Sequence, residues 1–124
     1  MIHVSDGKVK ALAKMVHEAN KAFCESIGDN SQVSWSEAPE YNHTSACVGV
    51  RAICDNPDMP HDELHNVWME SKKADGWVYG EVKDREKKTH PSLVPYSELS
   101  ASEKYKDSLV KAIVVSYLDF LTQE

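Results

Sequence analysis

Residues 68–96 contain most of the side chains in this chain that could bind a flat, charged molecule. Indole rings stack on planar ring systems, and cationic side chains pair with phosphate groups. Trp68 and Trp77 can supply the ring faces. The side chains that can supply charge are Lys72, Arg85, Lys87, Lys88 and His90. Composition alone favours a simpler interpretation, in which both tryptophans belong to the core and the lysine run is a solvated turn.

Other candidate chemistry is weaker. His61 and His65 are spaced i, i+4, which can hold a metal on a helix, but no motif for a third ligand lies nearby. Cys24 lies on the same helix flank as His17, yet nothing in the sequence orients the pair for nucleophilic catalysis. The glycine-rich phosphate loops, the GxSxG elbow and the HExxH motif do not occur. We therefore expect no metal, no cofactor and no catalytic residue.

The bulk properties are those of a small globular domain. The 124 residues can bury a core without disulfides, and three cysteines without a CxxC pair fit a reducing compartment. A net charge of −6 argues against general nucleic-acid binding. No apolar run approaches the roughly 20 residues of a membrane span, and the first ten residues lack a secretory core. We expect one cytoplasmic domain, residues 1–124, with no nucleic-acid or membrane partner.

Helical periodicity flanks the aromatic segment on both sides. Apolar residues recur at helical spacing from a cap at Ser5 or Asp6 to about Ile27, and Gly28 follows as a C-terminal cap. The second predicted helix would include Pro39 in its first turn. The later helices are predicted at about residues 36–55, 60–74 and 100–122.

Two short strands are predicted inside the aromatic segment. Residues 77–82 alternate, which would put Trp77 and Tyr79 on one face, and residues 89–94 would return antiparallel across a charged turn at 83–88. The wide apolar face of the last helix predicts either a central core helix or a partner surface. The predicted fold class is therefore mainly α, with about four helices and a small antiparallel β-hairpin.

Two predicted helices carry polar groups next to their apolar faces. His61, His65, Trp68 and Lys72 share one face of the third helix. Asn20 falls inside the apolar stripe of the first helix. It is either a buried amide that ties the helix to a loop or a polar group that lines a pocket.

The aromatic segment also resembles a known family. The stretch DGWVYGEVKDREKKTHPSLVPYSEL is similar to the ryanodine receptor repeat, the RyR domain, in which a helix with a tryptophan leads into GW-x-YG, V-x-D and K-x-HP-x-LVPY-x-x-L. The matching residues are Trp68, Gly76, Trp77, Tyr79, Gly80, Val82, Asp84, Lys88, His90, Pro91, Leu93, Val94, Pro95, Tyr96 and Leu99. Glu81 departs from the pattern, where the family often has Pro. Residues 16–40 resemble the N-terminal part of stand-alone bacterial and viral versions, so the resemblance covers about residues 9–121.

This resemblance implies a mostly helical fold with a small hairpin, and binding rather than catalysis. Receptor repeats resemble an adenine-nucleotide receptor site built around the helix tryptophan, the position that Trp68 matches. They lie in pairs with pseudo-twofold symmetry, so a single-repeat chain is expected to form a C₂ homodimer. Stand-alone versions occur in prokaryotes and their phages, in contexts that suggest sensing or capture of nucleotide signals.

Together, the residues and the resemblance predict a non-enzymatic domain that binds a nucleotide-derived small molecule, such as an adenine nucleotide or a cyclic nucleotide used as an anti-phage immune signal. Trp68 would stack on the base, with Trp77 or Tyr79 behind it, and Asn20 would contact a polar edge. The other candidate ligand-binding residues are Lys88, His90 and Lys72, which would face phosphate or ribose, and His65.

Two other functions remain open from the sequence. The chain is alternatively an interaction module that docks a protein partner on the wide face of its last helix. The second alternative is an enzyme that acts on nucleotides, with His17, His65 or His90 as general base, although the sequence shows no oriented base and nucleophile.

Overall fold

The computed structural model describes residues 3–122, and within that range the protein is mainly helical, as predicted. The α-helices are α1 (Asp6–Ser26), α2 (Glu40–Asp55), α3 (His61–Ala74) and α4 (Ala101–Thr122). Single 3₁₀ turns, Trp35–Glu37 and Tyr96–Glu98, precede α2 and α4. Two strands of two residues each, β1 (Val78–Tyr79) and β2 (Thr89–His90), follow α3. None of the described helices has the length and apolarity that a membrane crossing requires.

Several helix ends fall where local chemistry predicts them. The hydroxyl groups of Ser5 and Ser100 each accept a hydrogen bond, at 3.3 Å, from the backbone N–H three residues later. Such serine caps satisfy amides that the first turn of a helix leaves unpaired. Gly28 and Gly76 follow α1 and α3 with φ angles of +88° and +91°, a left-handed backbone that glycine adopts without strain.

The start of α2 differs from the prediction. The helix expected from residue 36 begins at Glu40, and Pro39 precedes it in extended backbone (φ −67°, ψ 158°) instead of lying in its first turn. A proline disfavours helical backbone at the residue before it, and Ala38 is accordingly extended. Pro60 likewise caps α3, which begins one residue later than predicted. The two prolines therefore set where α2 and α3 begin.

The core lies where α1, α2 and α4 meet, with α3 packed on α2 and α4. Its fully buried side chains include Leu12 from α1, Ile53 from α2 and Val114 from α4. Burial of an aliphatic side chain of this size contributes about 1.5–3 kcal/mol. Val114 and Leu118 of α4 are buried, so part of the apolar face of this helix serves the core, whereas Phe120 of the same predicted face is 57% exposed.

The two strands run parallel, so the predicted antiparallel hairpin is wrong. Val78 pairs with Thr89, and Tyr79 pairs with His90, in parallel register. An antiparallel bridge joins Thr89 to Asp84, within the turn itself. Thr89 thus pairs in parallel with β1 and in antiparallel fashion with Asp84. These two pairings require the chain to reverse direction twice between β1 and β2. The charged turn predicted at 83–88 is the second reversal, and the first follows β1 directly.

Trp77 and Tyr79 do not share a face, contrary to the predicted alternation. Trp77 is 2% exposed, whereas Tyr79 is 56% exposed. The paired strand residues are Val78 and Tyr79, so the alternation of a longer strand does not extend back to Trp77. The indole of Trp77 instead packs against Tyr41 of α2, with ring centroids 5.5 Å apart.

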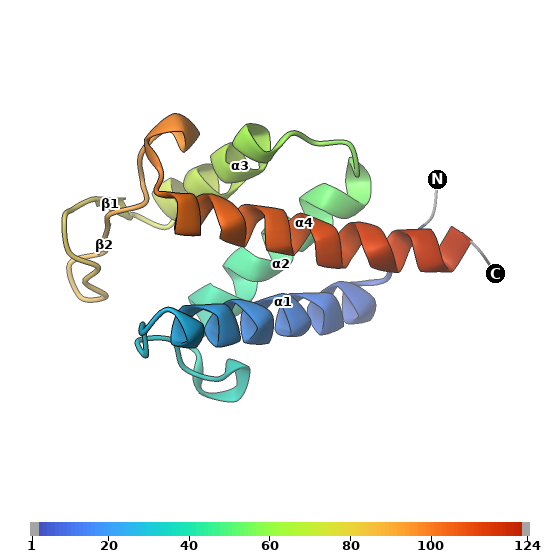
Figure 1. The fold of residues 1–124 in the computed structure, drawn as a ribbon, viewed down its shortest axis with the longest axis horizontal. Coiled ribbons are helices and arrows are strands. Elements are labelled where there is room, and N and C mark those ends of the chain that lie inside the picture. Colours follow the sequence, from blue (N-terminus) through green and yellow to red (C-terminus); the bar gives the residue numbers. More distant parts are fainter. Residues whose placement is uncertain (1–2, 123–124) are drawn as a thin grey trace.

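Figure 1 shows that one end of the molecule collects helix ends from distant parts of the chain. α1 and α4 run side by side in opposite directions along the long axis. The C-terminal ends of α1 and α3, the N-terminal ends of α2 and α4, and both strands lie at the same end of the molecule (Figure 1). Side chains that are far apart in the sequence therefore have a common place to meet.

Candidate functional site

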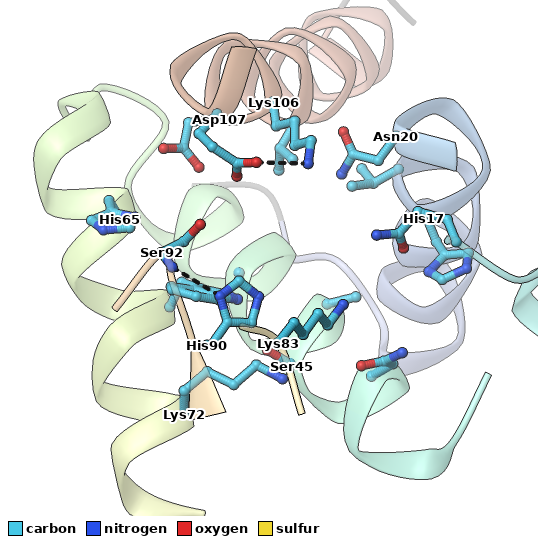
Figure 2. Close-up of a pocket in the computed structure, with 18 of the residues that line it drawn as sticks. His17, Asn20, Ser45, His65, Lys72, Lys83, His90, Ser92, Lys106 and Asp107 are labelled. Atoms are coloured by element: carbon cyan, nitrogen blue, oxygen red, sulfur yellow. Dashed lines mark hydrogen bonds and ion pairs between the residues drawn. The ribbon is translucent and has the colours of Figure 1, made fainter. Parts of the chain in front are cut away.

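A pocket of about 440 Å³ lies at the end of the molecule where these helix ends meet. Pockets that bind small molecules commonly have volumes of about 300–1,000 Å³. The walls come from the second half of α1, the first part of α2, the middle of α3, residues 77–92 and the first half of α4. Figure 2 shows the polar side chains that these elements direct into the pocket.

Aromatic rings form one wall of the pocket. Trp68 is half-buried, and its ring centroid lies 5.5 Å from that of His65 and 5.1 Å from that of His90. The Nε2–H of His65 donates to the Val94 carbonyl at 2.7 Å, which fixes the imidazole against Trp68. Trp77 also lines the pocket but is almost completely buried. Trp68 is therefore the ring with free surface for a planar ligand, and Trp77 is mainly part of the wall.

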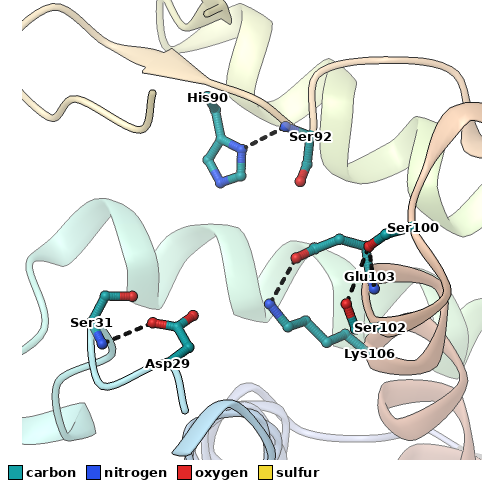
Figure 3. A network of polar contacts seen from close by, with 8 residues as sticks. All are labelled: Asp29, Ser31, His90, Ser92, Ser100, Ser102, Glu103 and Lys106. Carbon is teal, nitrogen blue, oxygen red and sulfur yellow. Dashed lines mark hydrogen bonds and ion pairs between the residues drawn. The ribbon is translucent and has the colours of Figure 1, made fainter. Parts of the chain in front are cut away.

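His90 is a neutral hydrogen-bonding group in this wall rather than the cation expected from the sequence. The backbone N–H of Ser92 donates to His90 Nδ1 at 3.0 Å, so this nitrogen carries no proton (Figure 3). Burial, and then the positive charges of Lys83 and Lys72, lower the pKa of His90 from 6.5 to about 4. At neutral pH the Nε2–H of His90 remains as a donor.

Two lysines without a carboxylate partner line the pocket. Lys72 is 7% exposed, and its Nζ lies 4.9 Å from the ring centroids of both Tyr41 and Trp77. Burial, and then repulsion by Lys83, lower the pKa of Lys72 to about 8. Burial, and then the positive charge of Lys106, lower the pKa of Lys83. Because Lys83 is exposed, burial affects its pKa less than that of Lys72. Neither ammonium forms an ion pair with a carboxylate of the described chain.

α4 contributes a polar cluster to the pocket. The Glu103 carboxylate pairs with the Lys106 ammonium at 3.0 Å (Figure 3). The backbone N–H of Glu103 donates to the hydroxyl of Ser100, which caps this helix. Although burial opposes the charge of Lys106, the pair with Glu103 raises the pKa of this lysine. Burial raises the pKa of the neighbouring Asp107 carboxyl from 3.8 to about 6. The first turns of α4 therefore hold the Glu103–Lys106 ion pair beside the poorly solvated carboxyl group of Asp107.

A polar loop edges the pocket on the side of α1. Asp29 Oδ1 accepts a hydrogen bond from the backbone N–H of Ser31 at 2.9 Å (Figure 3). Hydrogen bonding to the side chain of Ser31, and then to its backbone N–H, lowers the pKa of Asp29. Both residues line the pocket, so the turn that follows α1 is ordered by its own contacts before any ligand binds.

Unpartnered polar atoms converge on this pocket. Within residues 3–121, all the buried side-chain nitrogen and oxygen atoms that lack a hydrogen-bond partner belong to pocket-lining residues. These atoms are Asn20 Oδ1, Ser45 Oγ, Trp77 Nε1 and Asp107 Oδ2. Leaving such a group unpaired costs about 1–3 kcal/mol. Because the atoms come from different elements, they mark the pocket rather than one badly packed contact.

Six of the eight residues predicted to bind a ligand line this pocket. They are Asn20, His65, Trp68, Lys72, Trp77 and His90. Tyr79 and Lys88 lie outside its lining. Tyr79 faces solvent, and Lys88 Nζ donates to the Asp75 carbonyl at 2.7 Å. For Asn20, the structure favours the interpretation in which the amide lines a pocket.

The sequence did not single out several of the polar residues in the pocket. Those residues are Ser45, Lys83, Glu103, Lys106 and Asp107. Lys83 was placed in a solvated turn. A usable signal existed in α4, because Asp107, Val110 and Val114 are spaced i, i+3 and i+7 and so share one face. A carboxylate on the face that carries the core residue Val114 is unusual enough to suggest a site.

The weaker candidates for chemistry are engaged in other contacts. His17 and Cys24 both line the pocket, but the Nε2–H of His17 donates to the Val33 carbonyl at 2.7 Å. The Nε2 of His65, half of the possible metal pair with His61, is likewise bonded to a backbone carbonyl. No group of three or more potential metal-binding side chains occurs between residues 3 and 122. The pocket presents aromatic rings, ammonium groups and hydrogen-bonding groups.

Comparison with known families gives one match that spans much of this architecture. The model of the family described as RyR domain matches residues 53–121, more than half of the chain. The matched range begins near the end of α2 and includes α3, both strands and α4, so it contains Trp68, Lys72, Lys83 and Asp107. Asn20 lies outside it. The chain belongs to the RyR domain family.

Proposed function

We propose that this protein is a non-enzymatic binding domain for a nucleotide-derived small molecule, which it senses or sequesters. The convergence of unpartnered polar atoms on the pocket that Trp68 lines carries this proposal. These atoms have no hydrogen-bond partner within the described part of the protein, so a bound molecule that carries polar groups can pair with them.

The chemistry of the lining fits a nucleotide better than an apolar metabolite. The half-buried face of Trp68 suits a planar base, which gains stacking energy in any orientation of its edge atoms. Lys72 and Lys83 suit phosphate oxygens, and Asn20 suits a polar edge of the base or a ribose hydroxyl. Adenine nucleotides and cyclic nucleotide signals of bacterial or phage origin are the first ligands to test.

The direct test is thermal unfolding of the protein with a panel of linear and cyclic adenine nucleotides. A ligand present at 100 times its dissociation constant adds about 2.7 kcal/mol to the free energy of unfolding. For a domain of this size that is a rise of several degrees in Tm. If no member of the panel changes Tm, the proposal loses its main support.

A pair of variants separates specific binding from general effects on the fold. Trp68→Ala removes the exposed stacking face and is expected to abolish the ligand-induced rise in Tm. Tyr79→Ala removes an aromatic side chain that is exposed and lies outside the pocket, so the rise is expected to persist. Each variant is compared with its own ligand-free Tm. Equal loss in both variants would place the binding site elsewhere.

A sensor or sequestering domain releases its ligand unchanged. We expect the bound nucleotide, recovered after prolonged incubation and separated by chromatography, to be intact. Turnover of the nucleotide that Trp68→Ala abolishes would instead make this pocket an active site, as in the enzymatic alternative.

A further inference from the structure

Lys72 and Lys83 enter the pocket from different elements, α3 and the loop that joins β1 to β2. The charge of Lys83 acts on Lys72, and both charges act on His90. Lys106 is already compensated by Glu103, at 3.0 Å. Among the described residues, the pocket thus retains two ammonium groups without an anionic partner.

The loop holds Lys83 in place through hydrogen bonds on both sides of it. Thr89 Oγ1 donates to the Val82 carbonyl at 2.8 Å, and the backbones of Asp84 and Thr89 exchange two hydrogen bonds of 3.0 Å. Asp84 Oδ1 also accepts from the backbone N–H of Glu86 at 2.9 Å. A lysine carried on ordered backbone loses less conformational entropy on binding than one on a mobile loop. The backbone that carries Lys83 is therefore ordered, although the residue itself is exposed.

The other side of the pocket has the complementary polarity. In the view of Figure 2, Asn20 and Asp107 lie across the pocket from Lys72 and Lys83. Asn20 Oδ1 and Asp107 Oδ2 are buried oxygens without hydrogen-bond partners. Carbonyl and carboxylate oxygens accept hydrogen bonds, so they pair with amino or hydroxyl groups and repel phosphate.

We infer that the bound molecule carries at least two negative charges, with its anionic group between Lys72 and Lys83 and its hydrogen-bond donors against Asn20 and Asp107. The inference rests on the proposed function and adds the ligand class, a phosphorylated nucleoside with amino or hydroxyl groups directed toward α1 and α4. The two ammonium groups and the Nε2–H of His90 donate to the phosphate oxygens. A neutral nucleoside leaves Lys72 buried without a counter-charge.

The test is calorimetric titration of the full chain, at pH 7 and low ionic strength, with adenosine, adenosine monophosphate, adenosine diphosphate and inorganic pyrophosphate. Low salt is chosen because ions screen the contacts at issue. Charge-assisted hydrogen bonds predict that both nucleotides bind at least about tenfold more tightly than adenosine.

Two lysine variants of the same loop serve as the matched pair. Lys83→Met keeps an unbranched side chain one atom shorter and removes its charge, so it is expected to cancel most of the nucleotides' advantage over adenosine. Lys87→Met removes a charge that is also exposed but lies outside the pocket, and it is expected to leave this advantage unchanged. Lys72→Met is expected to act like Lys83→Met.

The outcomes separate this inference from the proposed function. If adenosine and its phosphates bind with equal affinity, or if Lys83→Met and Lys87→Met weaken binding equally, the inference is wrong while nucleoside binding stands. If only pyrophosphate binds and Lys83→Met abolishes that binding, the anion site stands and the nucleotide function fails. If none of the four compounds binds, the inference is overturned, and the proposed function is decided by the cyclic nucleotides of the thermal-unfolding panel.

Discussion

Lys72 shows at the scale of one residue what the pocket costs the free protein. Its ammonium is buried beside two aromatic rings, which offset part of the lost hydration by about 0.5–2 kcal/mol. The charged and imidazole groups that interact with Lys72 are Lys83, Asp75 and His90. The largest of the charge effects on its pKa is repulsion by Lys83. The pKa of Lys72 therefore falls from 10.5 to about 8.

The lowered pKa of Lys72 determines how this residue makes the stability of the protein depend on pH. The pKa of Lys72 is lower in the folded protein than in the unfolded chain, so the unfolded chain holds the proton more tightly. The penalty on stability is fully present below pH 8 and disappears as the pH rises through the interval from about 8 to 10.5. We expect stability to increase with pH across that interval, as far as this residue is concerned.

Lys72→Met is predicted to raise the free energy of unfolding at pH 7 by about 1–3 kcal/mol, because one pKa unit corresponds to about 1.4 kcal/mol. The variant is also predicted to remove the rise in stability between pH 8 and 10.5. Urea denaturation at pH 7 and pH 10 measures both effects. Lys73→Met, on the exposed side of α3, is the control and is expected to change neither. A loss of stability in Lys72→Met would show that the free protein needs this charge.

Sequence patterns located the residues whose side chains share one helix face. Trp68 and Lys72 were predicted together because i, i+4 spacing on α3 settles which side chains are neighbours. Lys83 was not predicted, because its role depends on contacts between elements, whereas Asp107 was missed although it shares a helix face with Val114. His90 was expected to carry charge, and only the contact from Ser92 and the neighbouring lysines make it neutral.

At the scale of elements, the loop between β1 and β2 decides where Lys83 lies. Gly80 begins this loop against Thr89 of β2. A Cβ atom at position 80 would lie 2.5 Å from Thr89 Cβ, closer than packed carbon atoms approach. The Gly80–Thr89 contact therefore allows the chain to reverse immediately after β1.

Gly80→Ala is predicted to displace this loop, to lower the free energy of unfolding by about 1–3 kcal/mol, as overpacking commonly does, and to weaken binding of phosphorylated ligands. Gly7→Ala is the matched control, since a Cβ there meets nothing within 4 Å and alanine favours the first turn of α1. Chemical denaturation and calorimetric titration of both variants test the prediction. Unchanged ligand affinity in Gly80→Ala would show that the loop position does not matter for binding.

The elements themselves were predictable to different degrees. Periodicity and caps predicted the α-helices to within a residue or two, apart from α2, where Pro39 moved the start to Glu40. The direction of the strands was not predictable, because it depends on a double reversal stabilised by Asp84 and Thr89. A pattern of alternation shows that a segment is extended but not how the chain returns to it.

At the scale of the whole molecule, the pocket exists because α1 and α3 end, and α2 and α4 begin, at the same end of the molecule (Figure 1). The mainly helical class followed from helical periodicity, whereas the predicted antiparallel hairpin was wrong. The position of the pocket did not, because no local pattern states which helix ends converge. α1 provides Asn20 from outside the range matched by the family, so the complete pocket requires residues on both sides of that boundary.

The homodimer remains a prediction from the paired arrangement of receptor repeats. We expect light scattering at high protein concentration to give twice the mass of one chain, because a single repeat can recreate the pair by twofold symmetry. Dilution should shift the measured mass toward that of the monomer. A monomer mass at the highest soluble concentration would contradict this prediction without affecting the pocket.

The most direct test of the account is a crystal structure of the protein with the nucleotide that raises Tm the most. We expect electron density for the base on the face of Trp68, for phosphate between Lys72 and Lys83, and for a donor group near Asn20 or Asp107. Density for the nucleotide at another surface, with this pocket holding only water at saturating ligand, would contradict the central claim.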